Sequence, residues 1–311
     1  MRIIVTGSIA YDYLMSFPGS FTEHLLPDHL QRVSLSFLVD SLDKRRGGCA
    51  PNIAYTLALL GERPVLMATA GQDFDDYRRW LDEAGIDTSL VTQVDDKFTA
   101  SFFCSTDTSG NQIASFYTGA MANAGDLSFR DAGGCDLAII SPNDPGAMVR
   151  YARECRELGI PYIYDPSQQV ARMGGDQLND GVVGARIIIC NDYEYEILRE
   201  KTGLDAAAML RHAEAVIVTK GEKGSSILLR DRTIDTPAVP PVEAVDPTGV
   251  GDAFRGGLMK GLAARAPWET CARLGSVAAT YALEHLGGSS HRYSWPEFKA
   301  RYESQFGTLA L

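Results

Sequence analysis

Six short apolar segments, separated by longer amphipathic stretches, constrain the fold of this 311-residue chain more than any other feature. Each segment is rich in Ile, Val, Leu or Tyr and is bounded by residues that favour turns. Unbroken rather than alternating hydrophobicity is typical of strands that are covered on both faces, as in a parallel sheet. The segments are 2–8, 64–70, 136–141, 161–165, 186–191 and 215–220.

Helical patterns lie between these segments. In 74–84, for example, the apolar residues recur on one helical face. Alternation of strands and helices predicts a single α/β core with right-handed crossovers. The predicted helices are 51–60, 74–84, 145–158, 251–264, 268–285 and a last one from Trp295.

Two regions interrupt this rhythm. Residues 13–46 carry scattered aromatic side chains without a helical period, and 98–117 indicates two strands, 99–105 and 112–117, joined by the turn Asp107-Thr-Ser-Gly110. Together they predict a small antiparallel sheet that stands off the main sheet as a lid over a cleft; an edge extension of the main sheet is the alternative. The lid then comprises 13–46 and 98–117, and the core comprises 1–12, 47–97 and 118–311. A hairpin of 225–229 and 233–236 is expected to extend the main sheet.

Composition excludes several classes of function. Lys and Arg number 29 against 40 Asp and Glu, a formal charge of −11, which argues against a protein that wraps nucleic acid or coats an anionic membrane. No apolar run reaches the length of a membrane span. The six cysteines contain no C-x-x-C pair, so we expect buried free thiols in a soluble, cytoplasmic protein rather than a zinc site or a disulfide framework.

The segment Asp246-Pro-Thr-Gly-Val-Gly-Asp252 carries the most specific chemistry. Its glycines let the backbone turn tightly before a predicted helix, which leaves the N–H groups of Gly249, Val250 and Gly251 free to bind an anion. Asp252 falls in the first helical turn. It is either a helix cap or a base that takes a proton from a nucleophile attacking a bound phosphate, and spacing alone leaves both open.

Two further polar segments follow the same logic. Gly47-Gly-Cys-Ala-Pro-Asn52 precedes a helix and permits close approach of a ligand, and Asn191-Asp-Tyr-Glu194 lies at the end of a predicted strand. Ligands of open α/β sheets bind at the carboxyl ends of strands, where such residues can order Mg²⁺ and its waters. An ordinary loop and a solvated helix start are the respective alternatives. The P-loop, protein-kinase and G-x-S-x-G patterns are all missing from the sequence.

Taken together and in this order along the chain, the motifs resemble those of the ribokinase-like (PfkB) family of carbohydrate and nucleoside kinases. The resemblance implies a three-layer α/β/α sandwich, Rossmann-like with a mainly parallel sheet, and a small β-sheet lid. Within the family, the sequence looks closest to prokaryotic nucleoside kinases of the adenosine-kinase branch. The segments that carry this closer likeness are Ser8–Asp12, Ser36–Leu38, Phe116–Met121 and Asp246–Gly249.

The resemblance also implies roles for individual residues. Asp252 would be the general base, and Gly249, Val250 and Gly251 would hold the transferring phosphoryl group. The acceptor would be gripped by Asp12, Gly47, Gly48 and Asn52. Phe116 and Tyr117 would stack on a nucleobase, unless they only form the lid's own core.

The remaining implied residues concern the phosphate donor and cations. Nucleotide binding would involve Asn191, Thr219, Gly221 and Gly251. Asn191 and Glu194 would position Mg²⁺ through water, and Asp246 would be the ligand of a monovalent cation such as K⁺.

The function implied is ATP- and Mg²⁺-dependent phosphorylation of the 5′-hydroxyl of a ribonucleoside such as adenosine. A sugar kinase for ribose or fructose is the alternative within the family, and a non-catalytic nucleotide-sensing module is the alternative of another class. The expected partner is a small-molecule nucleoside, with no nucleic acid and no membrane. The protein is expected to be a monomer or a homodimer through the lid.

Overall fold

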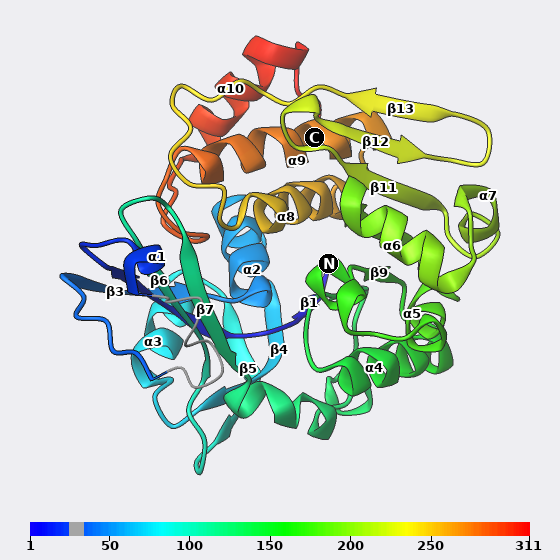
Figure 1. The fold of residues 1–311 in the computed structure, drawn as a ribbon. Coiled ribbons are helices and arrows are strands. Elements are labelled where there is room, and N and C mark those ends of the chain that lie inside the picture. The colour runs from blue at the N-terminus through cyan, green and yellow to red at the C-terminus, as the bar shows by residue number, and fades with distance from the viewer. Residues whose placement is uncertain (25–33) are drawn as a thin grey trace.

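The computed structural model describes residues 1–24 and 34–311, and its centre is a nine-stranded sheet (Figure 1). The strand order is β13-β12-β11-β10-β9-β8-β1-β4-β5. All pairs from β11 to β5 are parallel, and the β12–β13 hairpin continues the edge antiparallel, as predicted. The strands are β1 (Ile3–Thr6), β4 (Val65–Gly71), β5 (Asp87–Val94), β8 (Leu137–Ile140), β9 (Tyr162–Tyr164), β10 (Ile187–Asn191), β11 (Ala215–Thr219), β12 (Ser225–Leu228) and β13 (Thr233–Thr236).

Helices cover both faces of this sheet, which gives the three layers (Figure 1). One face packs against α2 (Cys49–Leu59), α3 (Asp75–Glu83), α8 (Val250–Ala263) and α9 (Trp268–Leu283), with α10 (Trp295–Phe306) outside α9. The other face packs against α4 (Pro145–Leu158), α5 (Gly175–Val182), α6 (Asp192–Thr202) and the short α7 (Ala206–Met209). Short 3₁₀ turns occupy η2 (Gly119–Asp126), η3 (Phe129–Asp131), η4 (Ser167–Ala171) and η5 (Gly221–Lys223).

The two-sided burial explains the unbroken apolar runs in the sequence. Successive side chains of a strand point to opposite faces, so alternate residues enter different cores. Ile187 and Ile189 of β10 belong to the core under α2 and α8, whereas Ile188 belongs to the core under α4 and α5. Most positions of these central strands are therefore apolar, and the buried Thr6 and Thr69 are exceptions whose hydroxyls donate to backbone carbonyls.

A separate four-stranded sheet stands beside the large one, in the order β3-β2-β6-β7 (Figure 1). Its strands are β2 (Ala10–Ser16), β3 (Ser41–Gly47), β6 (Ala100–Thr106) and β7 (Gln112–Tyr117), with the short α1 (Phe21–His24) at one end. The outer pairs are antiparallel, but the central β2–β6 pair is parallel, which differs from the purely antiparallel sheet that was predicted. The chain enters this sheet twice, once after β1 and once after β5, and each time it leaves the carboxyl end of a strand of the large sheet. The two entering strands, β2 and β6, therefore run in the same direction.

Most predicted elements are present within one to three residues of their expected ends, and α4 matches at both ends. The elements that were not predicted include the helices α5, α6 and α7 and the edge strand β5, whose mixed polar sequence conceals it. The predicted lid segment 13–46 includes residues 25–33, which lie outside the described residues; β2 begins at Ala10, ahead of that segment. Across the described chain, no helix has the length and apolar character of a membrane span, and all six cysteines are free.

Candidate active site

The start of α8 presents backbone N–H groups to solvent. Gly249 precedes the helix in the left-handed conformation, at φ 75°, and within the described chain no side chain caps the helix. The Val250 N–H makes only a long contact, 3.4 Å, to the carbonyl oxygen of Pro247, and Gly251 is exposed. A Cβ on Gly249 would lie 2.4 Å from Cα of Gly288, so the turn requires glycine. An open helix start of this kind binds anions.

Asp252 stands in the first turn of α8, next to these N–H groups. The cap position belongs to Gly249, and the Asp252 carboxylate instead accepts a 2.9 Å hydrogen bond from Nδ2 of Asn52 in α2. Burial raises the pKa of Asp252 to about 7, although the charge of Arg255 and the bond from Asn52 oppose it. Oδ1 of Asn52 is buried and has no hydrogen-bond partner among the described residues. The geometry therefore favours a proton acceptor over a helix cap.

A buried ion pair, which sequence reasoning missed, lies behind this turn. Arg255 makes a two-pronged contact with Asp165, at the end of β9, and donates a 2.9 Å bond to the carbonyl oxygen of Gly251. Both side chains are at most 5% exposed. Burial alone would lower the pKa of Arg255, but the charge of Asp165 raises it above its ordinary value. The signal was an arginine inside the small, apolar run 253–258, since a buried arginine requires a paired anion.

Asn191 and Glu194 form a capping box at the start of α6. The Asn191 side chain accepts from the Glu194 N–H at 2.8 Å, and the Glu194 carboxylate accepts from the Asn191 N–H at 2.8 Å and from the Ser167 hydroxyl at 3.2 Å. Thr219 is the register partner of Asn191 on β11, and Gly221 follows it, exposed. These residues therefore lie together at the carboxyl ends of the neighbouring strands β10 and β11.

The small sheet brings Asp12 and Phe116 to one face. Asp12 pairs in register with both Arg45 and Phe102, and Phe102 pairs with Phe116, so their side chains point the same way. Tyr117 lies on the opposite face, because alternate residues of a strand point in opposite directions. Phe102, a lid aromatic that was not among the predicted site residues, lies between Asp12 and Phe116 on this face. Burial raises the pKa of Asp12 to about 6, with the charge of Arg45 opposing and that of Asp246 reinforcing the shift.

The two glycines before α2 keep the backbone close to its neighbours. A Cβ on Gly47 would lie 2.4 Å from Oδ2 of Asp12. Gly48 has φ 98°, and a Cβ there would lie 2.4 Å from the carbonyl oxygen of Ser8 and 2.7 Å from the backbone nitrogen of Ala10. Backbone atoms cannot swing away as a side chain can, so Gly48 fixes how the small sheet joins the core.

Gly48→Ala is therefore expected to destabilise the protein more than Gly61→Ala does. Both glycines have positive φ, 98° and 84°, but a Cβ on Gly61 meets open space. The control should cost only the strain of a left-handed residue, about 1–2 kcal/mol, and Gly48→Ala should cost clearly more. Denaturant unfolding of the two variants measures the difference. Equal losses of unfolding free energy in the two variants would show that the close contact with the backbone of Ser8 adds no cost.

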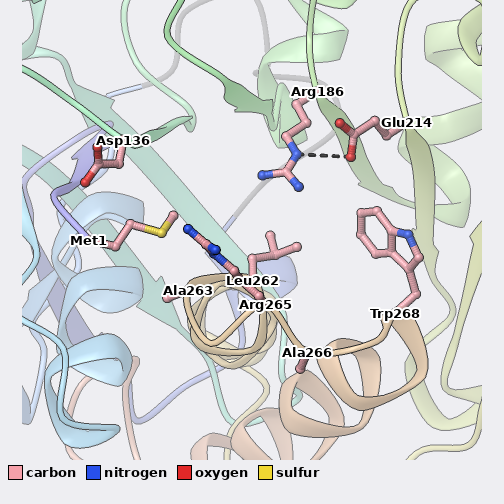
Figure 2. A pocket seen from close by; sticks show the side chains of 9 residues that line it. All are labelled: Met1, Asp136, Arg186, Glu214, Leu262, Ala263, Arg265, Ala266 and Trp268. Carbon is pink, nitrogen blue, oxygen red and sulfur yellow. Dashed lines mark hydrogen bonds and ion pairs between the residues drawn. The ribbon is translucent and has the colours of Figure 1, made fainter.

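A cavity of about 750 Å³ lies at the amino ends of the strands of the large sheet (Figure 2). Met1, Asp136, Arg186 and Glu214 line it and lie one or two residues before strands β1, β8, β10 and β11, and Arg186 pairs with Glu214 at 3.1 Å. The cavity thus belongs to the amino ends of the strands, whereas Asn191 and Asp165 belong to their carboxyl ends. Ligands of parallel sheets bind at carboxyl ends, so size alone does not mark the site.

A carboxylate with a raised pKa beside an open helix start, at the carboxyl ends of the strands in a sandwich with an added small sheet, is the arrangement expected of a small-molecule kinase. The chain belongs to the pfkB family of carbohydrate kinases, whose sequence profile matches residues 8–294.

Individual relatives are similar along their whole lengths. The nucleoside kinase of Methanothermobacter thermautotrophicus is 30% identical over 98% of this chain and 96% of its own. A structure of Burkholderia thailandensis nucleoside kinase in complex with inosine has a TM-score of 0.88 and 37% identity, and covers 99% of each chain. The nucleoside kinase of Methanocaldococcus jannaschii has a TM-score of 0.89 at 25% identity, with 98% of this chain and 99% of that chain covered. These likenesses bear out the fold class and the family resemblance.

Proposed function

We propose that this protein is an ATP-dependent nucleoside kinase that phosphorylates the 5′-hydroxyl of a ribonucleoside, with a purine nucleoside such as adenosine as its acceptor. The observation that carries the chemistry is Asp252, held by Asn52 next to the open start of α8. The choice of a nucleoside rests on the relatives, since the Burkholderia enzyme, 37% identical, was solved with inosine and with ADP-inosine.

Phosphoryl transfer needs a base and a place for negative charge. The acceptor hydroxyl gives its proton to Asp252 as its oxygen bonds to the γ-phosphorus, and the bond to the ADP oxygen breaks. The backbone N–H groups of Gly249, Val250 and Gly251 would donate to the phosphoryl oxygens and stabilise their charge. Because these donors are fixed by the backbone, they need no rearrangement during the reaction.

The acceptor would lie between the two sheets. Asp12 accepts hydrogen bonds from two ribose hydroxyls, since a carboxylate offers two oxygens to vicinal donors. Gly47 has no side chain to press on the Asp12 carboxylate, since a Cβ there would lie 2.4 Å from Oδ2 of Asp12, and Gly48 and Asn52 would complete the grip on the acceptor. Phe116, 39% exposed and on the face of Asp12, is the better candidate for stacking on the base than Tyr117 on the opposite face.

The nucleotide would enter as its Mg²⁺ complex. Among the described residues, no group of three or more His, Cys, Asp or Glu side chains is arranged to hold a metal by itself. The capping box already uses oxygens of Asn191 and Glu194, so these two residues would reach Mg²⁺ through its waters. Thr219 and Gly221 would contact the nucleotide, and Gly251 its terminal phosphate.

Six free thiols favour the cytoplasm as the compartment.

A panel of acceptors tests the proposal. We expect ADP release with inosine or adenosine in the presence of ATP and Mg²⁺, and little with ribose or fructose, because a free sugar offers no base to stack. The product should be the 5′-monophosphate, identified by its mass and by its cleavage with periodate, which requires that the vicinal 2′ and 3′ hydroxyls are both free. Turnover of sugars alone would instead assign a sugar kinase, and no ADP release with any acceptor would favour a nucleotide-sensing module.

A further inference from the structure

Asp246 joins three separate segments just before α8. One carboxylate oxygen accepts the N–H of Thr248 at 2.9 Å, and the other accepts the N–H of Gly287 at 2.9 Å. That second oxygen also lies 3.5 Å from Nη1 of Arg45, on strand β3 of the small sheet. The Asp246 and Arg45 side chains are only 15% and 25% exposed, so water screens this contact weakly.

The loop around Gly287 directly supports the anion-binding turn. Gly288 packs so closely under Gly249 that a Cβ on Gly249 would lie 2.4 Å from its Cα. On the other side, the stem of Arg45 covers Gly287, where a Cβ would lie 3.5 Å from Cδ of Arg45. Arg45, Asp246 and the 287–288 backbone therefore form one continuous contact with the turn at Gly249.

The residues around Asp246 do not fit a free monovalent cation. Such an ion needs the carboxylate of Asp246 as its charged ligand, yet a guanidinium, which is permanently charged, already faces that carboxylate. Asp43 accepts from Nε and Nη2 of Arg45, each at 2.6 Å, and so fixes the guanidinium with Nη1 toward Asp246. A second cation next to Arg45 would be repelled.

We propose that Arg45 takes the place of the monovalent cation, so that the kinase works without K⁺. Arg45 is a positioning residue: it neutralises Asp246 and holds the loops at 246–249 and 287–288 in the shape that the open start of α8 requires. Since Arg45 also pairs in register with Asp12, it ties the acceptor carboxylate to the same turn. The comparison of rates below rests on the proposed kinase activity, whereas the thermal unfolding test does not require it.

The first test compares rates with inosine, ATP and Mg²⁺ in potassium and in tetramethylammonium chloride at equal ionic strength. The wild type should turn over equally in both. Arg45→Gln should lose about tenfold or more in tetramethylammonium, as expected when catalytic groups are misplaced, and should regain rate with K⁺ or guanidinium ion. Arg45→Lys should stay independent of K⁺. Lys44→Gln is the matched control: it also removes a cation from β3, but Lys44 lies over the ring of Tyr11, 3.8 Å away.

The second test uses thermal unfolding of the same proteins without substrates. An ion that binds the native state raises the melting temperature, so K⁺ should raise that of Arg45→Gln and leave the wild type and Lys44→Gln unchanged. Specific K⁺ stabilisation or activation of the wild type would overturn the inference, as would an Arg45→Gln variant that ignores K⁺ in both tests. A wild type that lacks kinase activity but shows the expected melting pattern would refute only the proposed function.

Discussion

Asp252→Asn should lower kcat by about 10²–10⁴-fold, the usual contribution of a positioned general base. Asn keeps the size of the side chain and an oxygen to accept the bond from Asn52, but it cannot take a proton from the acceptor hydroxyl. Substrate affinity should change little, because the groups assigned to binding remain. Steady-state kinetics with the acceptor found by the panel measures both quantities.

The pH profile of the wild type is a second test of Asp252 as the general base. Burial raises the pKa of Asp252 to about 7, so the carboxylate is half protonated near neutral pH. A base works only when deprotonated, so kcat/KM should rise through pH 7 and level off above it. In Asp252→Asn this rise should vanish. A variant with near-wild-type turnover, or with an unchanged profile, would falsify the role of Asp252.

Stability separates a catalytic loss from misfolding. The folded-state pKa of Asp252 lies above its ordinary value of 3.8, so ionising the buried carboxylate costs stability as the pH rises toward 7. Asn removes that cost, and Asp252→Asn should melt at the same temperature as the wild type or higher at pH 8. Asp176→Asn is the matched control, because Asp176 also occupies the first turn of a helix, α5, but is exposed. It should leave kcat unchanged.

The sequence revealed the parts of the fold that follow from local pattern. Unbroken apolar strands such as β10 predict two-sided burial, and the pair of glycines around Val250 predicts a tight turn before α8. Contacts between distant segments were not accessible in the same way. The Arg255–Asp165 pair spans 90 residues, and the Arg45–Asp246 contact joins a strand of the small sheet to the loop before α8, so neither leaves a periodic signal in the chain.

The direction of each side chain in the small sheet could not be predicted from the sequence either. Phe116 and Tyr117 are adjacent, and hydrophobicity alone gives both the same status. Only the register decides that Phe116 shares the face of Asp12 and that Tyr117 does not. A shift of one residue in that register would exchange them.

Arg255→Met should destabilise the protein strongly, because it leaves the Asp165 carboxylate buried without its charged partner. Removing one member of a buried ion pair typically costs about 3–5 kcal/mol of unfolding free energy. Adding Asp165→Leu should restore much of this loss, since the double variant buries no unpaired charge. Arg79→Met is the matched control: Arg79 also pairs with an aspartate from a helix, at 2.9 Å, but the pair is exposed and should contribute less than about 1 kcal/mol.

The pH profile distinguishes support of the fold from support of the reaction in these variants. After burial, the charge of Arg255 is the largest influence on the pKa of Asp252 and lowers it, whereas the charge of Asp165 raises it by less. Arg255→Met should therefore move the rise in kcat/KM to higher pH, and the double variant should lie between that variant and the wild type. A purely structural pair would lower stability and leave the midpoint of the profile in place. Both charges would then matter only for folding, and the electrostatic tuning of Asp252 would have to come from its burial and from Asn52.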